Sequence, residues 1–161
     1  MQVSAKVDYG IRALSVLAEN FDAETPKLIK GDYIAKQQSI PIKFLEAILT
    51  ELRHQGFIVS QRGAEGGYRL SRDPSEMNLA EIVRALDGPL AAVRGERPEQ
   101  VQYEGSAAGL FDVWLAVRVS LRNVLEQVTL ADVLAGKFTP AINDLLKDPD
   151  AKKSRPLNAG G

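Results

Sequence analysis

The chain has 161 residues, which is enough for one domain with a substantial core and an appendage. Its 20 basic and 21 acidic residues give a net charge of −1, and a hydrophobic fraction of 45% is typical of a globular protein. The absence of cysteine excludes disulfides, thiolate zinc sites, cysteine-ligated iron–sulfur clusters and a cysteine nucleophile. No apolar run approaches the roughly 20 residues of a membrane helix, and the N-terminus lacks a signal-peptide core. We therefore expect a soluble cytoplasmic protein with no membrane partner.

The first half of the chain predicts two helices, a tight break, a third helix and a hairpin. Apolar residues recur every three or four positions over residues 4–20, and a short helix is expected at 32–38. Pro41 ends the break and suits the start of the next helix, because a missing N–H costs nothing there. That helix, 41–54, carries one apolar stripe, made of Phe44, Leu45, Ile48, Leu49 and Leu52.

The rest of the chain begins with the two strands of the hairpin, which are expected at 57–60 and 68–70. A further helix should begin after Asn78 and end at the Asp87-Gly88-Pro89 turn. From Leu110 an apolar seam with coiled-coil spacing predicts a long helix, and Thr129 with Asp132 predicts the start of a short one. The last dozen residues are expected to be disordered.

This order is typical of a winged helix-turn-helix. The predicted fold class is mainly α, with a small β-hairpin wing and a long C-terminal dimerisation helix. The expected division is a DNA-binding domain at 1–89, an irregular connection at 90–109, a dimerisation helix with a short capping helix at 110–136, and a C-terminal tail at 137–161.

The helix at 41–54 has the position of a recognition helix, which enters the major groove. Lys43 can bond guanine or phosphate, Glu46 can accept from a cytosine amino group, and Ala47 can touch a thymine methyl. The alternative is that Lys43 and Glu46 are solvated surface, as on any amphipathic helix. Residues 36–72 hold six basic against three acidic residues, a net charge of +3, which would suit DNA if the fold gathered it on one face.

The segment 62–67, between the two predicted strands, reads Arg-Gly-Ala-Glu-Gly-Gly. Glycines let a backbone approach another surface closely, and Arg62 could enter a minor groove, whose negative potential attracts arginine. An ordinary flexible hairpin loop is the alternative. A nucleotide-binding loop is disfavoured, because that loop should follow a parallel strand and open a helix.

Seven segments taken together resemble the BadM/Rrf family of bacterial transcription regulators, which includes IscR-, NsrR- and CymR-type proteins. The most specific are the wing RGAEGGYRL and the helix end IVRALDGPL. The segments are residues 9–14, 34–35, 44–46, 52–53, 62–70, 82–90 and 129–132.

The resemblance implies a dimeric winged helix-turn-helix protein that represses transcription and binds double-stranded DNA. It places the minor-groove arginine at Arg62 and phosphate contacts near the start of the first helix. Cluster-bearing relatives hold iron–sulfur ligands as three cysteines in the connection, and this chain has none there, so we expect no cofactor. Its input would then be a small-molecule effector, a regulatory protein partner, or nothing. The full expected DNA interface is Ser4, Lys6, Tyr9, Pro41, Lys43, Glu46, Ala47, Arg53, Arg62, Gly66, Gly67 and Tyr68.

Two copies of the seam helix packed together would form the expected homodimer. Each large apolar side chain would contribute about 2 kcal/mol of gross burial energy. The alternative is that this helix packs within its own chain; Trp114 could also line an effector pocket, although a core position is the simpler interpretation. The expected interface residues are Leu110, Trp114, Val117, Leu121, Val124 and Val128.

Two other classes of function remain to be weighed. An enzyme is disfavoured, because no catalytic pair and no metal-ligand spacing is visible, and His54 suits a helix end. The second alternative is a protein-interaction module that uses the winged-helix surface, for which Glu46 and Glu51 would be suitable.

Overall fold

The computed structural model describes residues 2–154. It confirms a mainly helical fold with a two-stranded antiparallel hairpin. The elements are α1 (Ala5–Glu19), α2 (Gly31–Gln38), α3 (Ile42–His54), β1 (Ile58–Gln61), β2 (Gly67–Leu70), the 3-10 helix η1 (Pro74–Glu76), α4 (Leu79–Asp87), the 3-10 helices η2 (Pro98–Gln100) and η3 (Gly105–Ala107), α5 (Leu110–Leu125), α6 (Leu130–Ala135) and α7 (Pro140–Leu146).

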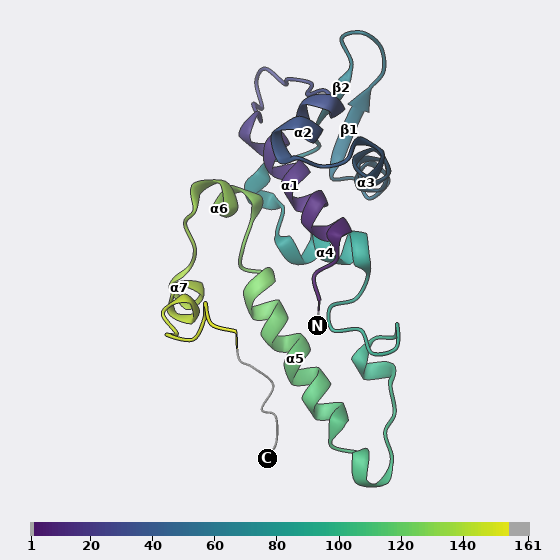
Figure 1. The fold of residues 1–161 in the computed structure, drawn as a ribbon, viewed down its shortest axis with the longest axis vertical. Helices are drawn as coiled ribbons and strands as arrows, with labels where there is room; N and C mark the ends of the chain where they lie inside the picture. The colour runs from purple at the N-terminus through teal and green to yellow at the C-terminus, as the bar shows by residue number, and fades with distance from the viewer. Residues whose placement is uncertain (1, 155–161) are drawn as a thin grey trace.

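The molecule consists of a packed body and a helical arm (Figure 1). Helices α1 to α4, the hairpin and α6 surround one core, whereas α5 extends away from that body beside the connection. α1 lies at the centre because it is apolar on most sides, and it contacts α2, α3, α4, α6 and β2. The largest fully buried side chains are Leu14, Leu17, Ile34, Leu45, Leu49, Leu52, Ile58, Leu70, Met77, Ile82, Leu130 and Val7.

The break between α2 and α3 forms as predicted. Ser39 adopts a left-handed conformation (φ 51°), which reverses the chain direction, and the Ile40 amide donates to the Ala35 carbonyl at 2.9 Å. The Ile40 side chain is buried, and Pro41 directly precedes the first residue of α3. These contacts fix the direction in which α3 leaves α2.

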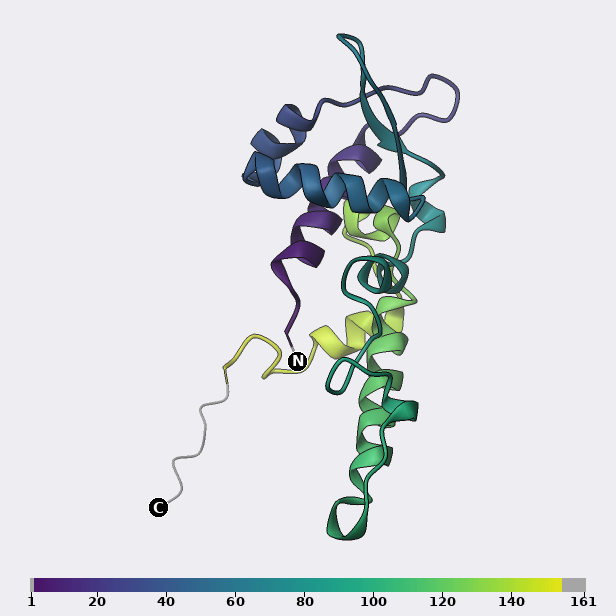
Figure 2. The same ribbon diagram turned by 90° about the vertical axis from the view of Figure 1, so that its right-hand side faces the viewer.

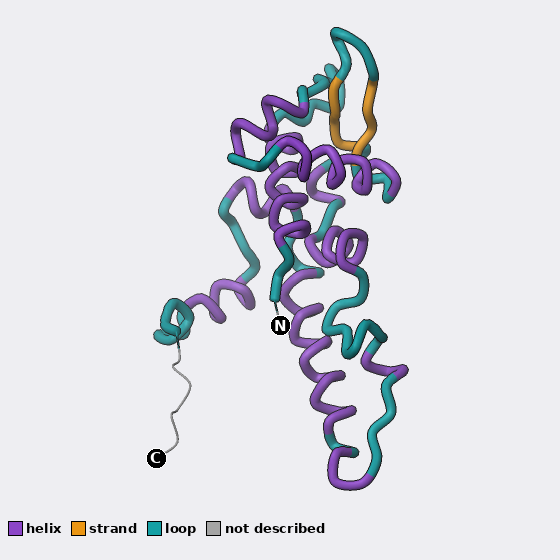
Figure 3. The backbone as a smooth tube through the Cα atoms, turned by 45° about the vertical axis from the view of Figure 1, so that its right-hand side comes forward, coloured by secondary structure: helices purple, strands orange, loops and turns teal. Residues whose placement is uncertain are grey.

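The hairpin is attached to the body by a third extended segment that the sequence did not reveal. β1 and β2 pair so that Ile58 faces Leu70 and Gln61 faces Gly67. On the other side of β2, Ile29 and Tyr68 exchange two backbone hydrogen bonds of 2.8 Å each. β2 is therefore held between β1 and the segment that leads into α2 (Figure 3, strands in orange).

The chain returns to the body after α5. The helix was expected to carry its seam to Val128, but it ends at Leu125, and Val128 is buried within its own chain. The Leu79 amide donates to the Val128 carbonyl (2.9 Å), and Leu130 lies in the core beside α1. Thr129 and Asp132 form the predicted cap as a full capping box. Hydrogen bonds from the Thr129 hydroxyl and amide lower the pKa of Asp132, so this cap stays charged at a more acidic pH than a free aspartate does.

The segment after α6 is more ordered than the sequence suggested. Residues 140–146 form α7, which begins with Pro140 and buries Ile142, where an irregular tail was expected. The disorder expected for the last dozen residues falls partly on 155–161, which lie outside the described residues. Within residues 2–154, no helix combines the length and apolar character that crossing a membrane requires.

Candidate nucleic-acid interface

The outward face of α3 is open to solvent. Leu45, Ile48, Leu49 and Leu52 are buried against the body, as predicted. A helix advances about 100° per residue, so residues spaced by three and four positions share a face. The face opposite the buried one is fully exposed and consists of Lys43, Ala47, Thr50 and His54.

Phe44 corrects the expected apolar stripe. The sequence assigned it to the buried side of α3, but 64% of its surface is exposed. The reason is geometric: it lies at the edge of the stripe, and the leucines and isoleucine at 45, 48, 49 and 52 already fill the contact with the body. Ile42 on α3 and Tyr33 on α2 are also exposed, so apolar groups are accessible at the start of α3 and on the neighbouring α2.

The charged side chains on this surface are largely free. Lys43, Glu46 and Arg62 are exposed, and none of them forms a side-chain hydrogen bond or ion pair with another described residue. Arg53 sits at the other end of α3, where its guanidinium donates to the Ser60 hydroxyl of β1 at 3.4 Å. The structure thus places Lys43, Glu46, Ala47 and Arg53 along one exposed helix, with the wing beside it (Figure 2).

Two glycines of the wing, Gly66 and Gly67, allow backbone segments to approach closely. A Cβ on Gly66 would lie 2.1 Å from the Gln61 carbonyl oxygen, and one on Gly67 would lie 2.7 Å from the Ile29 carbonyl oxygen. Gly66 is buried, Gly67 and Tyr68 are half-buried, and Lys30 donates to the Ala64 carbonyl at the tip. The chain can close this turn only without side chains at 66 and 67, and the closure leaves Arg62 exposed at the tip.

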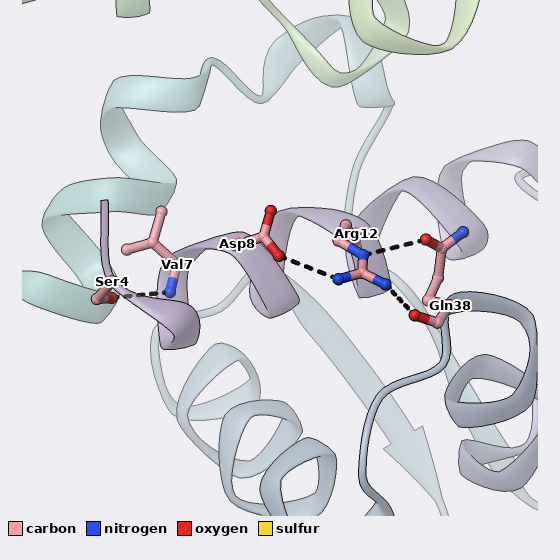
Figure 4. A network of polar contacts seen from close by, with 5 residues as sticks. All are labelled: Ser4, Val7, Asp8, Arg12 and Gln38. Carbon is pink, nitrogen blue, oxygen red and sulfur yellow. Dashed lines mark hydrogen bonds and ion pairs between the residues drawn. The ribbon is translucent and has the colours of Figure 1, made fainter. Parts of the chain in front are cut away.

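Three of the residues expected to contact DNA lie at the start of α1. Ser4 caps the helix, because its hydroxyl oxygen accepts from the Val7 amide at 3.1 Å (Figure 4). That hydroxyl retains its own proton as a donor. Lys6 is exposed, whereas Tyr9 is half-buried with the Arg12 guanidinium 5.4 Å from its ring centre.

Arg12 is a positioning residue that the sequence did not single out. It donates to the side-chain oxygen of Gln38 (3.3 Å) and to the Gln38 carbonyl, and it pairs with Asp8 at 3.1 Å (Figure 4). Because Gln38 is the last residue of α2, Arg12 joins α1 to the turn that directs α3.

Replacing Arg12 with alanine should destabilise the fold by about 1–2 kcal/mol, since the Gln38 carbonyl at the turn loses its charged donor. Asp8→Asn is the matched control, because it removes only an exposed pair worth about 0.5 kcal/mol or less. Urea unfolding of the two variants measures both values. Equal effects would show that the contacts to Gln38 contribute nothing.

The arm leaves apolar surface uncovered. No residue of α5 is buried in the single chain: Leu110 is exposed, and the seam residues Trp114, Val117, Leu121 and Val124 are half-buried. Val113 and Val119, which lie outside the predicted seam, are about half exposed, at 50% and 49%. The uncovered surface of α5 is thus broader than the seam.

An exposed helix that follows a tight helix–turn, with a glycine-closed hairpin beside it, defines the winged helix-turn-helix class of DNA-binding proteins. The family described as Rrf2, iron-dependent transcriptional regulator, matches residues 3–136. The chain belongs to the Rrf2 family of transcriptional regulators, which are not enzymes.

Relatives and solved structures agree with this assignment. Rv1287 of Mycobacterium tuberculosis, named as an HTH-type transcriptional regulator, is 42% identical over 154 residues, covering 96% of this chain and 94% of its own length. The regulator CymR of Bacillus subtilis is 32% identical over 133 residues, covering 83% of this chain and 89% of its own. The structure of B. subtilis CymR, described as the global cysteine regulator, superposes with a TM-score of 0.69 at 28% identity, over 85% of this chain and 98% of that one. T. potens IscR gives 0.67 at 32% identity, over 84% and 88%.

The donor groups of this chain do not fit an iron–sulfur cluster. The connection at 90–109 supplies arginine, glutamate and backbone groups where a cluster would need thiolates, and the chain has no cysteine anywhere. Across residues 2–154, no group of three or more His, Cys, Asp or Glu side chains is arranged to hold a metal. The iron of the family description therefore has no counterpart in these residues.

Proposed function

We propose that this protein is a cytoplasmic, sequence-specific transcriptional repressor that binds palindromic operators as a homodimer and carries no iron–sulfur cluster. The observation that carries the proposal is the exposed face of α3, backed by four buried apolar residues and flanked by the arginine-tipped wing. Lys43, Glu46 and Ala47 would read base edges in the major groove, and Arg62 would enter the adjacent minor groove. Ser4, Lys6 and Arg53 would bind phosphates.

The homodimer is supported by α5. A sixteen-residue helix with no fully buried residue leaves much of its apolar surface exposed, and a second copy would cover that surface. Leu110, Trp114, Val117, Leu121 and Val124 would form the contact, together with the exposed Val113 beside them. Pairing would present two recognition helices about 34 Å apart, one turn of DNA, and so would select palindromes.

Genome-wide capture of DNA by the purified protein would identify the operator, and salt titration on that operator tests the mode of binding. The logarithm of affinity should fall linearly with the logarithm of salt concentration, with a slope of about −0.9 per phosphate neutralised. A promoter fused to a reporter then distinguishes repression from activation.

Arg62→Ala should weaken operator binding by about tenfold, since it removes a guanidinium from the minor groove, and it should relax the preference for A·T pairs at the flanks of the site. Lys137→Ala, which removes one exposed charge beyond α6, is the control and should leave affinity unchanged. Fluorescence anisotropy with flank-substituted operators measures both effects. Unchanged affinity and preference would remove Arg62 from the interface.

A protein-interaction module is the second candidate, and the exposed Phe44 is the observation that favours it. Large exposed aromatic side chains are common anchors of protein interfaces. In that case no genomic fragment would be captured, and any residual binding to DNA would respond weakly to salt.

A further inference from the structure

We propose that a basic pocket between α4, the connection and α5 binds a small anion that carries phosphate or clustered carboxylate groups. We further infer that its occupancy regulates DNA binding, a step that rests on the function proposed above. The binding site itself stands on the geometry of the pocket alone.

The pocket has a volume of about 290 Å³ and is lined by three separate parts of the chain. Four arginines and one glutamate give its lining a net charge of +3. Guanidinium groups present paired donors that match phosphate and carboxylate oxygens, so this combination selects an anion. The lining consists of Arg84, Gly88, Pro89, Leu90, Arg97, Glu99, Arg118 and Arg122.

The ion pairs within the protein leave part of this charge uncompensated. Arg118 pairs with Glu99, and Arg84 pairs with Glu126. Neither Arg97 nor Arg122 forms a side-chain hydrogen bond or ion pair with any other residue in the described range 2–154. Two guanidinium groups are therefore available to a ligand.

Arg118 supplies a second, independent indication. Its side chain is only 14% exposed, and its Nε is buried without a hydrogen-bond acceptor. A buried donor without an acceptor is unfavourable, and native structures rarely leave one unsatisfied. An anion in the pocket would supply acceptor oxygens next to this side chain.

The size of the pocket limits the ligand. Small-molecule sites usually occupy roughly 300–1,000 Å³, so this pocket is at the lower end of that range. It suits inorganic phosphate, a short phosphorylated metabolite or a small polycarboxylate. It is too small for a dinucleotide.

The position of the pocket links ligand binding to the DNA-binding body. Arg84 belongs to α4, which packs against α1 and α3, whereas Arg118 and Arg122 belong to α5. The pairs Arg84–Glu126 and Arg118–Glu99 fasten the body and the connection to the arm. An anion that competes with Glu99 or Glu126 for these arginines would alter how α4 sits on α5, and hence the separation of the two recognition helices in a dimer.

The pocket and the proposed dimer contact lie on adjacent faces of α5. Arg118 and Arg122 are four residues apart and share a face, which is turned by about 60–100° around the helix from Leu121 and borders the seam at Trp114. A second copy bound at the seam would therefore lie next to the pocket.

The test uses the full-length protein, with inorganic phosphate and citrate as probes at an ionic strength held constant with sodium chloride. Trp114 is the single tryptophan of the chain and lies one turn before Arg118, so its fluorescence should report binding. Isothermal titration calorimetry gives the affinity independently. We expect saturable binding of at least one probe.

The double variant Arg97→Gln with Arg122→Gln should weaken that binding by tenfold or more, because both free guanidinium groups are lost. The matched control, Arg94→Gln with Lys137→Gln, removes the same charge from exposed positions outside the lining and should bind as the wild type does. Circular dichroism verifies that both variants are folded.

Absence of saturable binding for both probes would overturn the proposal. If both double variants weakened anion binding equally, the effect would be general electrostatics. If the Arg97/Arg122 variant bound the anion as tightly as the wild type, the bound anion would be an adventitious ion only. Either result also overturns the proposal. For regulation, operator affinity with and without the bound probe should differ by at least fivefold in the wild type and not in the Arg97/Arg122 variant. Anion binding without any DNA binding would reject the proposed function and leave the site intact, whereas DNA binding without anion binding would do the reverse.

Discussion

Val117→Asp should convert the protein into a monomer and reduce its affinity for a palindromic operator by about a hundredfold or more. Val117 lies midway along α5 in the apolar seam, so two aspartates would face each other in the proposed dimer and would be desolvated without a partner. Loss of the dimer removes the second half-site, and linked binding of two sites commonly contributes about 10²–10⁴ in affinity. Sedimentation equilibrium and operator titration measure the two effects.

The fold of the body should survive this substitution, because α5 buries no residue in the single chain. Leu134→Asp is the control: Leu134 is a similarly apolar, 43% exposed residue on α6, away from the seam. A Val117→Asp protein that remained dimeric would reject α5 as the interface. A monomer with unchanged operator affinity would reject the palindromic mode of binding.

Gly66→Ala should lower operator affinity by about tenfold or more and destabilise the protein by about 2 kcal/mol or more. The added Cβ would lie 2.1 Å from the Gln61 carbonyl oxygen and 2.7 Å from the Arg62 carbonyl carbon. Both neighbours belong to the backbone, so the wing has to open, and Arg62 moves with it. Thermal unfolding and anisotropy titration give the two values.

Gly109→Ala is the matched control, because this glycine has an ordinary φ of −64° and no atom within 4 Å of the added Cβ. It should be neutral or slightly stabilising, since alanine reduces the freedom of the unfolded chain. If Gly66→Ala bound the operator as tightly as the wild type, the shape of the wing would not matter for recognition.

The helices of the body were predictable because the buried face of each is marked by apolar residues at helical spacing. Leu45, Ile48, Leu49 and Leu52 repeat at helical spacing, and the structure buries all four. The helix caps were also predictable from the sequence. The Asn78 side chain accepts from the Glu81 amide, and residues 129–132 form a capping box. These signals act over three or four residues and depend on little else.

The candidate site was harder to predict from the sequence, because the contacts that position it join segments far apart in the chain. Arg12 reaches Gln38 across 26 residues, and Ile29 pairs with Tyr68 across 39. Phe44 was misassigned because apolar character alone does not tell whether an edge position meets the core or solvent. The basic pocket was not predicted from the sequence, because its arginines are scattered over residues 84–122. Only the packing of α4 against α5 brings them together.

The sequence itself determined the order of helix, turn, helix and glycine-rich hairpin, and the lack of any thiolate ligand. These features depend on local hydrogen bonding, periodicity and residue chemistry, which neighbouring residues set. Only the tertiary structure decided that α6 returns to the core of the body, that α5 buries none of its residues fully, and that four arginines meet between α4, the connection and α5. Those features depend on which surfaces meet when the chain folds. Because apolar burial is non-directional, an apolar pattern predicts that a surface will be covered but does not specify which element covers it.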